Sequence, residues 1–135
     1  MLNIKKDIKE NKLKGCYLLF GNESYLIKTY EDKIKKTALG GGDELMNSDT
    51  FDDRKLTAKT VMDSAETMPF LAEKRVVTVR DSGFFDQGKK DETEAIAKYL
   101  SNVPETTVII FAESKVDKRT AAYKAAVKYG YAAEL

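Results

Sequence analysis

The chain has 135 residues, of which 42% are hydrophobic and 33% are charged, a composition typical of one globular domain and not of a disordered chain. Its 23 basic and 22 acidic residues leave a net charge of +1, which excludes an electrostatic basis for strong binding to nucleic acid or membranes. The absence of histidine excludes Ser-His and Cys-His catalytic dyads and every metal site that needs an imidazole.

Apolar periodicity predicts helices and strands that alternate along the chain. Short continuous apolar runs, of which Thr107–Phe111 is the clearest, are separated by longer amphipathic segments of helical period. The predicted strands are 16–20, 48–51, 75–80 and 107–111, and another begins at 132. The predicted helices are 2–11, 23–39, 55–67, 91–101 and 118–129. This order predicts an α/β fold in which a parallel sheet of continuously apolar strands carries helices on both faces.

The only cysteine, Cys16, excludes an intrachain disulfide and fits a reducing compartment. The first seven residues are charged early and lack the apolar run of a signal peptide, and no segment has the length of a membrane span. We therefore expect a cytoplasmic protein that does not bind a membrane. Because the chain stops inside a predicted strand, we also expect a piece of a longer protein, truncated at its C-terminus.

The first strand-to-helix turn is where parallel α/β folds usually bind phosphate. A working phosphate loop needs the pattern G-x-x-x-x-G-K-[ST]. Counting from Gly21, the second glycine is replaced by Leu26, the phosphate-binding lysine by Ile27 and the magnesium-binding hydroxyl by Lys28. Glu23 adds a carboxylate near the helix N-terminus, where a phosphate would lie.

Gly21, Asn22, Glu23 and Ser24 are therefore interpreted as a degenerate phosphate-binding turn that holds no nucleotide. The alternative is a plain glycine turn with a helix cap at Asn22 or Ser24. Asp81 follows the 75–80 strand at a place that binds magnesium in ATPases, but Ser82 stands where the catalytic glutamate would be. We expect no catalytic residue, metal or cofactor.

Met68-Pro69-Phe70-Leu71 is an uncharged stretch directly after the predicted helix 55–67. Met68 continues the apolar face of that helix, which favours its burial, whereas Pro69 prevents further regular helix. Phe70 and Leu71 come after this break, so they either fold back into the core or form an exposed apolar site for a partner. For the next apolar pair, Phe84-Phe85 in a predicted loop, we favour packing against the domain.

These segments together resemble the N-terminal domain of the δ subunit of the bacterial DNA polymerase III clamp loader. The resemblance rests on 17–27 and 68–77, and 107–111 and 118–135 fit the same pattern. It implies that residues 1–135 form an AAA+ (P-loop NTPase-like) domain whose nucleotide site has decayed. It also implies that a helical lid domain and a C-terminal collar domain lie outside this chain.

Members of this family bind the ring-shaped sliding clamp through a hydrophobic wedge that reads roughly Gln-x-Met-Ser-Leu-Phe. The corresponding stretch here is Glu66–Leu71, in which Glu66 replaces the glutamine, Pro69 replaces the serine and the last two residues are reversed. The resemblance implies that Met68, Phe70 and Leu71 form the clamp-binding wedge, and that Phe70 and Leu71 are exposed.

The resemblance further implies a subunit of the DNA polymerase III holoenzyme, a DNA-directed DNA polymerase and nucleotidyltransferase. Such a subunit binds the sliding clamp (the beta subunit) and helps open it for loading onto primed DNA during replication, without ATPase activity of its own. The implied partners are the clamp, the gamma/tau and delta prime subunits of the loader, and DNA indirectly through the complex. Two alternatives are an active P-loop NTPase or nucleotide kinase, which Ile27 disfavours, and a generic α/β interaction scaffold.

Overall fold

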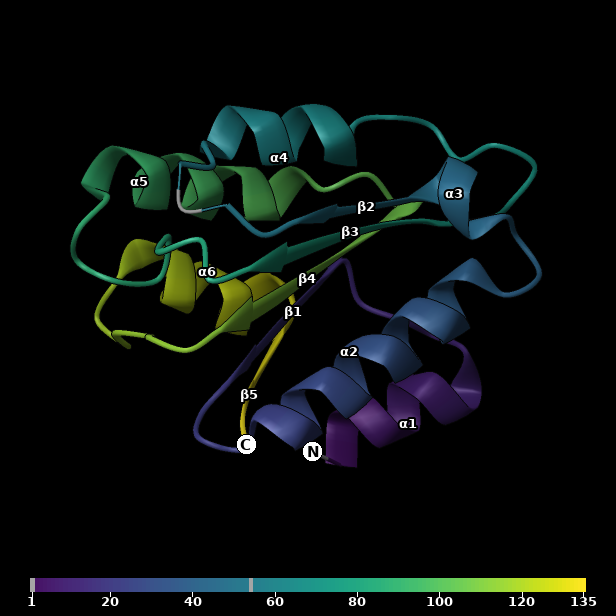
Figure 1. The fold of residues 1–135 in the computed structure, drawn as a ribbon, viewed down its shortest axis with the longest axis horizontal. Coiled ribbons are helices and arrows are strands. Elements are labelled where there is room, and N and C mark those ends of the chain that lie inside the picture. The colour runs from purple at the N-terminus through teal and green to yellow at the C-terminus, as the bar shows by residue number, and fades with distance from the viewer. Residues whose placement is uncertain (1, 54) are drawn as a thin grey trace.

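The computed structural model describes residues 2–53 and 55–135 and contains a five-stranded parallel sheet in the order β2-β3-β4-β1-β5 (Figure 1). All four strand pairings are parallel, and Leu18 at the centre of β1 lies opposite Phe111 on one side and Ala132 on the other. The strands are β1 (Cys16–Phe20), β2 (Ser48–Phe51), β3 (Arg75–Arg80), β4 (Thr107–Glu113) and β5 (Tyr131–Glu134). The predicted α/β class and parallel sheet are therefore confirmed.

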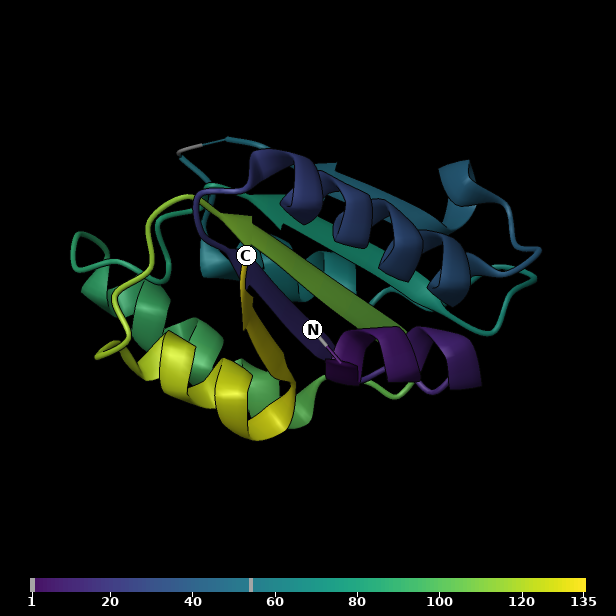
Figure 2. The same ribbon diagram turned by 90° about the horizontal axis from the view of Figure 1, so that it is seen from below.

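Helices cover both faces of the sheet (Figure 2). One face carries α1 (Leu2–Glu10) and α2 (Ser24–Leu39), and the other carries α4 (Ala58–Ala65), α5 (Lys90–Tyr99) and α6 (Ala121–Tyr129). A 3₁₀ turn at Leu100–Asn102 follows α5, and the four-residue α3 (Glu44–Asn47) directly precedes β2. No helix within the described ranges combines the length and the apolarity needed to cross a bilayer.

The central strands β1, β3 and β4 are largely apolar because each one separates two cores. In β1, Tyr17 and Leu19 pack under α1 and α2, whereas Leu18 and Phe20 pack under the other helical layer. Successive side chains of a strand point to opposite faces, so a strand that is covered on both sides needs an apolar residue at each position. All five residues of β1 are accordingly buried.

The aromatic pair in the loop after β3 belongs to the core. Phe84 and Phe85 are both fully buried, and the ring of Phe85 meets that of Phe111 edge to face with centroids 4.9 Å apart. The expectation that this pair packs against the domain is confirmed.

The predicted helix 55–67 is too long at both ends, since α4 covers Ala58–Ala65, and side-chain hydrogen bonds account for its late start. Asp53 accepts a hydrogen bond from the backbone N–H of Lys55 at 2.9 Å, which holds a turn before the helix. Thr57 then caps α4 by accepting from the N–H of Thr60 at 3.3 Å, so the helix begins at Ala58.

Other element boundaries differ by a few residues for similar reasons. Thr120 caps α6 by accepting from the N–H of Tyr123 at 3.2 Å, so this helix begins three residues later than predicted. The expected cap of α2 at Asn22 or Ser24 is wrong: the capping position is Glu23, whose side chain makes no capping hydrogen bond. Strand β4 continues to Glu113, two residues beyond the predicted end.

We predict that Gly130→Ala destabilises the domain, because an added Cβ would lie 2.1 Å from the main-chain oxygen of Cys16 in β1. Relieving such a collision with a central strand should cost about 1–3 kcal/mol of the free energy of unfolding. Urea denaturation would measure it. Gly88→Ala is the matched control, since no atom lies within 4 Å of the added carbon. Equal unfolding midpoints for the two variants would contradict the prediction.

Candidate functional site

The turn between β1 and α2 lies at the carboxyl edge of the sheet and is closed by the chain itself. Gly21 has a φ of 119°, and a Cβ there would lie 2.1 Å from the main-chain oxygen of Leu135. That oxygen accepts hydrogen bonds from the backbone N–H groups of Asn22, at 3.1 Å, and Glu23, at 3.4 Å. In a phosphate loop such N–H groups face the ligand. Here two of them bond the segment that follows β5.

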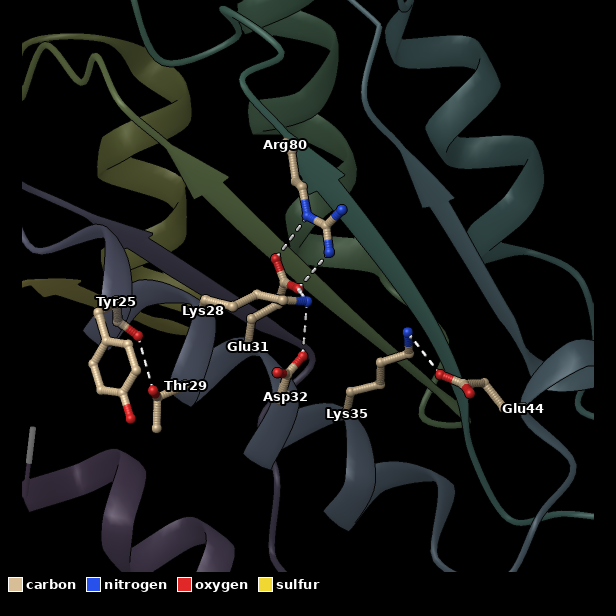
Figure 3. Close-up of polar contacts among 8 residues, drawn as sticks. All are labelled: Tyr25, Lys28, Thr29, Glu31, Asp32, Lys35, Glu44 and Arg80. Carbon is tan, nitrogen blue, oxygen red and sulfur yellow. Dashed lines mark hydrogen bonds and ion pairs between the residues drawn. The ribbon is translucent and has the colours of Figure 1, made fainter.

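An ion-pair cluster lies beside this turn (Figure 3). Arg80, at the end of β3, donates from Nε and Nη2 to the two carboxylate oxygens of Glu31 on α2, at 3.0 and 2.6 Å. Lys28 donates to Glu31 at 3.1 Å and to Asp32 at 3.0 Å. The paired fork of guanidinium and carboxylate is a strong, directional arrangement. It connects α2 to β3 at the edge where a nucleotide would be expected.

Burial and pairing act in opposite directions on Glu31. Its carboxylate is almost completely buried, and this desolvation by itself would raise the pKa. The hydrogen bonds from Arg80 and Lys28 outweigh it and lower the pKa of Glu31 below its ordinary value. Glu31 therefore stays ionised at neutral pH and holds both cations.

A cavity of about 230 Å³ lies beside the ion-pair cluster. The two cations that reach it, Lys28 and Arg80, are the ones engaged by Glu31, so neither offers an unpaired charge to a phosphate. Ser24 is the only residue of the predicted degenerate turn, apart from Gly21, that lines it. The lining residues are Gly21, Ser24, Ile27, Lys28, Glu31, Arg80, Asp81, Ala112, Glu113 and Ser114.

Glu113, the last residue of β4, is a second buried carboxyl group at this edge. It accepts hydrogen bonds from the N–H of Ser82 at 3.1 Å, from the Ser82 hydroxyl at 3.0 Å and from the N–H of Gly83 at 3.2 Å. Burial nevertheless raises the pKa of Glu113 to about 7, although these hydrogen bonds act to lower it. Glu113 thus holds the loop after β3 and titrates near neutral pH.

Asp81 has a structural partner at the position that the sequence compares with a magnesium ligand. Its carboxylate accepts from the N–H of Ser114 at 2.8 Å, and its backbone adopts a φ of 48°. Ser82 is buried against Glu113. Across the described ranges, no group of three or more Asp, Glu, His or Cys residues is arranged to hold a metal ion.

The predicted wedge lies at the opposite, amino edge of the sheet, in the loop that leads from α4 to β3. Phe70 is 52% exposed and Leu71 is 87% exposed, which answers the question left open by the sequence. Met68 is 71% exposed, so the expectation that it continues a buried helical face is wrong. Helix α4 ends at Ala65, so Met68, which precedes Pro69, lies outside the helix and does not share its buried face.

Asn47, at the end of α3, holds this loop in place. Its side chain is fully buried, accepts from the N–H of Phe70 at 2.6 Å and donates to the carbonyl of Phe70 at 3.0 Å. A third hydrogen bond joins its amide to the carbonyl of Asp43 at 2.9 Å. Leu71, next to the held residue, has a φ of 54°, a conformation that a side chain disfavours. The surroundings therefore impose the shape of the loop.

Arg75 anchors the same region from the first position of β3. Its buried guanidinium donates to the carbonyl of Ser64 at 2.9 Å and to the carbonyl of Met46 at 3.3 Å, and it pairs with Asp49 of β2. It thereby joins the end of α4 to the end of α3. Sequence reasoning identified neither Asn47 nor Arg75 as functional; the one available signal was an arginine opening an otherwise apolar strand.

The structure thus separates the two predicted sites. The turn Gly21–Ser24 lies at the carboxyl edge, where Gly21 and Ser24 line the cavity beside the ion-pair cluster, whereas Met68, Phe70 and Leu71 are exposed at the amino edge. At the carboxyl edge, the charged side chains of Lys28, Glu31 and Arg80 bond one another. The amino edge presents apolar side chains that the chain itself does not cover.

Comparison with protein families gives a match to the model described as DNA polymerase III, delta subunit, over residues 17–131. A curated relative, the DNA polymerase III subunit delta of Bacillus subtilis, is 28% identical over 141 residues, covering 99% of this chain and 41% of the relative. The chain therefore spans less than half the length of this relative.

Two solved structures share the fold. The DNA clamp loader delta protein of Bacillus subtilis superposes with a TM-score of 0.86 at 26% identity, over 99% of this chain and 42% of that one. A DNA polymerase III gamma subunit-related protein of Thermotoga maritima gives a TM-score of 0.69 at 16% identity, over 98% and 45% of the two chains. The second likeness concerns the fold alone.

We predict that Glu113 makes the domain less stable as the pH rises from its usual pKa of 4.5 towards about 7. In this window the folded state keeps a proton that the unfolded chain releases, so unfolding becomes easier as the pH rises. Glu113→Gln removes this dependence. The melting temperature of the variant, relative to the unmodified protein, should therefore increase between about pH 5 and pH 8. Glu94→Gln on the exposed side of α5 is the control, and parallel curves for Glu113→Gln and the unmodified protein would refute the prediction.

Proposed function

The chain belongs to the DNA polymerase III delta subunit family, and on that basis we propose that it is the part of a clamp-loader subunit that binds the sliding clamp. Met68, Phe70 and Leu71 form the docking wedge. The single observation that carries this proposal is the exposure of Phe70 and Leu71 at one edge of an otherwise well-packed domain. Exposed apolar clusters on a folded domain mark interaction sites.

The wedge can supply the energy that such binding needs. Full burial of a Phe or Leu side chain contributes roughly 1.5–3 kcal/mol. Two adjacent side chains in one pocket therefore suffice for a binding hot spot. The two hydrogen bonds between the Asn47 side chain and the main chain of Phe70 hold the loop before binding, which reduces the entropy lost on docking.

Clamp opening follows if the wedge binds the two states of the ring with different affinity. A ligand shifts an equilibrium only by the difference between its affinities for the two states. We propose that the pocket for Phe70 and Leu71 is better formed in a ring with one interface open. Binding energy then favours the open ring, which the whole loader places on primed DNA.

The proposed subunit has no ATPase activity of its own. Ile27 stands where a phosphate loop has its lysine, and Lys28 is paired with Glu31 and Asp32. The turn's N–H groups at Asn22 and Glu23 bond Leu135. These contacts support a role in which ATP is used elsewhere in the loader, by the gamma/tau subunits. The further proposed partners are the delta prime subunit and, through the complex, DNA in the cytoplasm.

We predict that the chain does not bind nucleotide, which also separates this proposal from the alternative of an active NTPase or nucleotide kinase. Titration with a fluorescent ATP analogue in the presence of magnesium should give no saturable signal, because the turn lacks the phosphate-binding lysine and the N–H groups of Asn22 and Glu23 already bond Leu135. Tight magnesium-dependent binding would contradict the prediction and revive the alternative.

Removing the wedge should weaken clamp binding without unfolding the domain. Phe70→Ala combined with Leu71→Ala should weaken binding to the sliding clamp of the same organism by at least about tenfold, because two buried side chains are lost. Surface plasmon resonance would measure it. Val127→Ala is a matched control, since Val127 has the same 52% exposure as Phe70 but lies on α6. Undiminished binding by a folded double variant would disprove the proposed role.

A further inference from the structure

Exposed apolar side chains are concentrated on two neighbouring segments. Eight large apolar side chains are exposed within the described ranges, and three of them are scattered over α2 and α6. The other five lie in α3 and in the loop between α4 and β3, at the amino edge of β2 and β3 (Figure 1). These five, named the apolar tip, are Leu45, Met46, Met68, Phe70 and Leu71.

The two segments of the apolar tip form one unit although more than 20 residues of chain separate them. Asn47 in α3 bonds both main-chain groups of Phe70 through its fully buried side chain. Arg75 donates to the carbonyl of Met46. The residue next to each segment is also closely packed: a Cβ added to Gly42, before α3, would lie 2.7 Å from the Cβ of Ala72, after the loop residue Leu71. The loop therefore cannot shift independently of α3.

Helix α3 is also fixed from its other side. Asp43 caps it by accepting from the N–H groups of Leu45 and Met46, at 2.8 and 3.3 Å. Lys35 of α2 pairs with Glu44 at 2.8 Å (Figure 3). Of its four residues α3 buries only Asn47. Leu45, at 92% exposure, adds almost nothing to the core, yet its position is well determined.

From this arrangement we infer that α3 is the second half of the docking surface, and that the partner covering Phe70 and Leu71 also covers Leu45 and Met46. The inference rests on the proposed function and names the same partner, the sliding clamp. A standard protein interface buries roughly 800 Å² on each partner, more than one short loop can provide. Leu45 and Met46 extend the apolar surface where the loop ends, on a backbone that is held rigidly to it.

The test uses the full-length subunit and the sliding clamp of the same organism. Leu45→Ala combined with Met46→Ala should raise the dissociation constant by about tenfold, as expected when two exposed side chains lose their contacts in the complex. The melting temperature should change little, because Leu45 is almost fully exposed and Met46 is half exposed. Val127→Ala should leave the affinity unchanged. The Phe70→Ala, Leu71→Ala double variant is measured in parallel.

The outcomes separate the two proposals. If the Phe70, Leu71 variant binds weakly and the Leu45, Met46 variant binds normally, the inference about α3 is wrong and the proposed function stands. If the unmodified subunit does not bind the clamp, or if neither variant loses affinity, both are wrong. Sedimentation velocity of the free subunit tests whether a second copy of the chain covers this surface instead of the clamp. A dimer that the Leu45, Met46 substitutions dissociate would assign this surface to a second copy of the chain and overturn the inference.

Discussion

Coverage of the sheet on both faces is the constraint on which the rest of the structure depends. Because β1 packs Tyr17 and Leu19 into one core and Leu18 and Phe20 into the other, its interior has no room for a polar or exposed functional group. The valines and isoleucines of β3 and β4 likewise alternate between the two cores, and the one polar side chain within this part of β3, Thr78, is fully buried. Any group that meets a ligand or partner must therefore lie at an edge, where the strands end and the loops begin.

The carboxyl and amino edges of the sheet present different kinds of side chains. At the carboxyl edge, where parallel α/β folds usually bind ligands, carboxylates are already bonded within the protein: Glu31 pairs with Arg80 and Lys28, and Glu113 accepts from the Ser82 hydroxyl. A nucleotide phosphate would have to compete with carboxylates that are already in place. At the amino edge, polar groups are used to hold the backbone, and the side chains left outside are apolar. The chemistry of the first edge favours rigidity, and that of the second favours a protein partner.

The sequence predicted the central strands well because a doubly covered strand leaves a continuous apolar run, as at Cys16–Phe20 and within Thr107–Glu113. It failed where side chains override periodicity. Thr57 starts α4 late, and the chain turns away after Ala65, so Met68 lies outside the helical face that its spacing suggested. The phosphate-loop comparison needed only residue types at fixed spacing. The role of Asn47 depends on a contact between residues 23 positions apart, and α3 is too short to show a period.

The apolar tip carries large exposed side chains on a backbone that hydrogen bonds hold in one conformation. A loop that contains Pro69 and carries large exposed side chains would normally sample many conformations, and a partner would have to select one of them. Here the two hydrogen bonds from Asn47 determine the position of Phe70, and Leu71 is kept at a positive φ that an isolated loop would leave. The conformational entropy of the loop is therefore lost during folding and not during binding. If this surface binds the sliding clamp as proposed, more of its binding energy is available for the difference between a closed and an open ring, the quantity on which the proposed clamp opening depends.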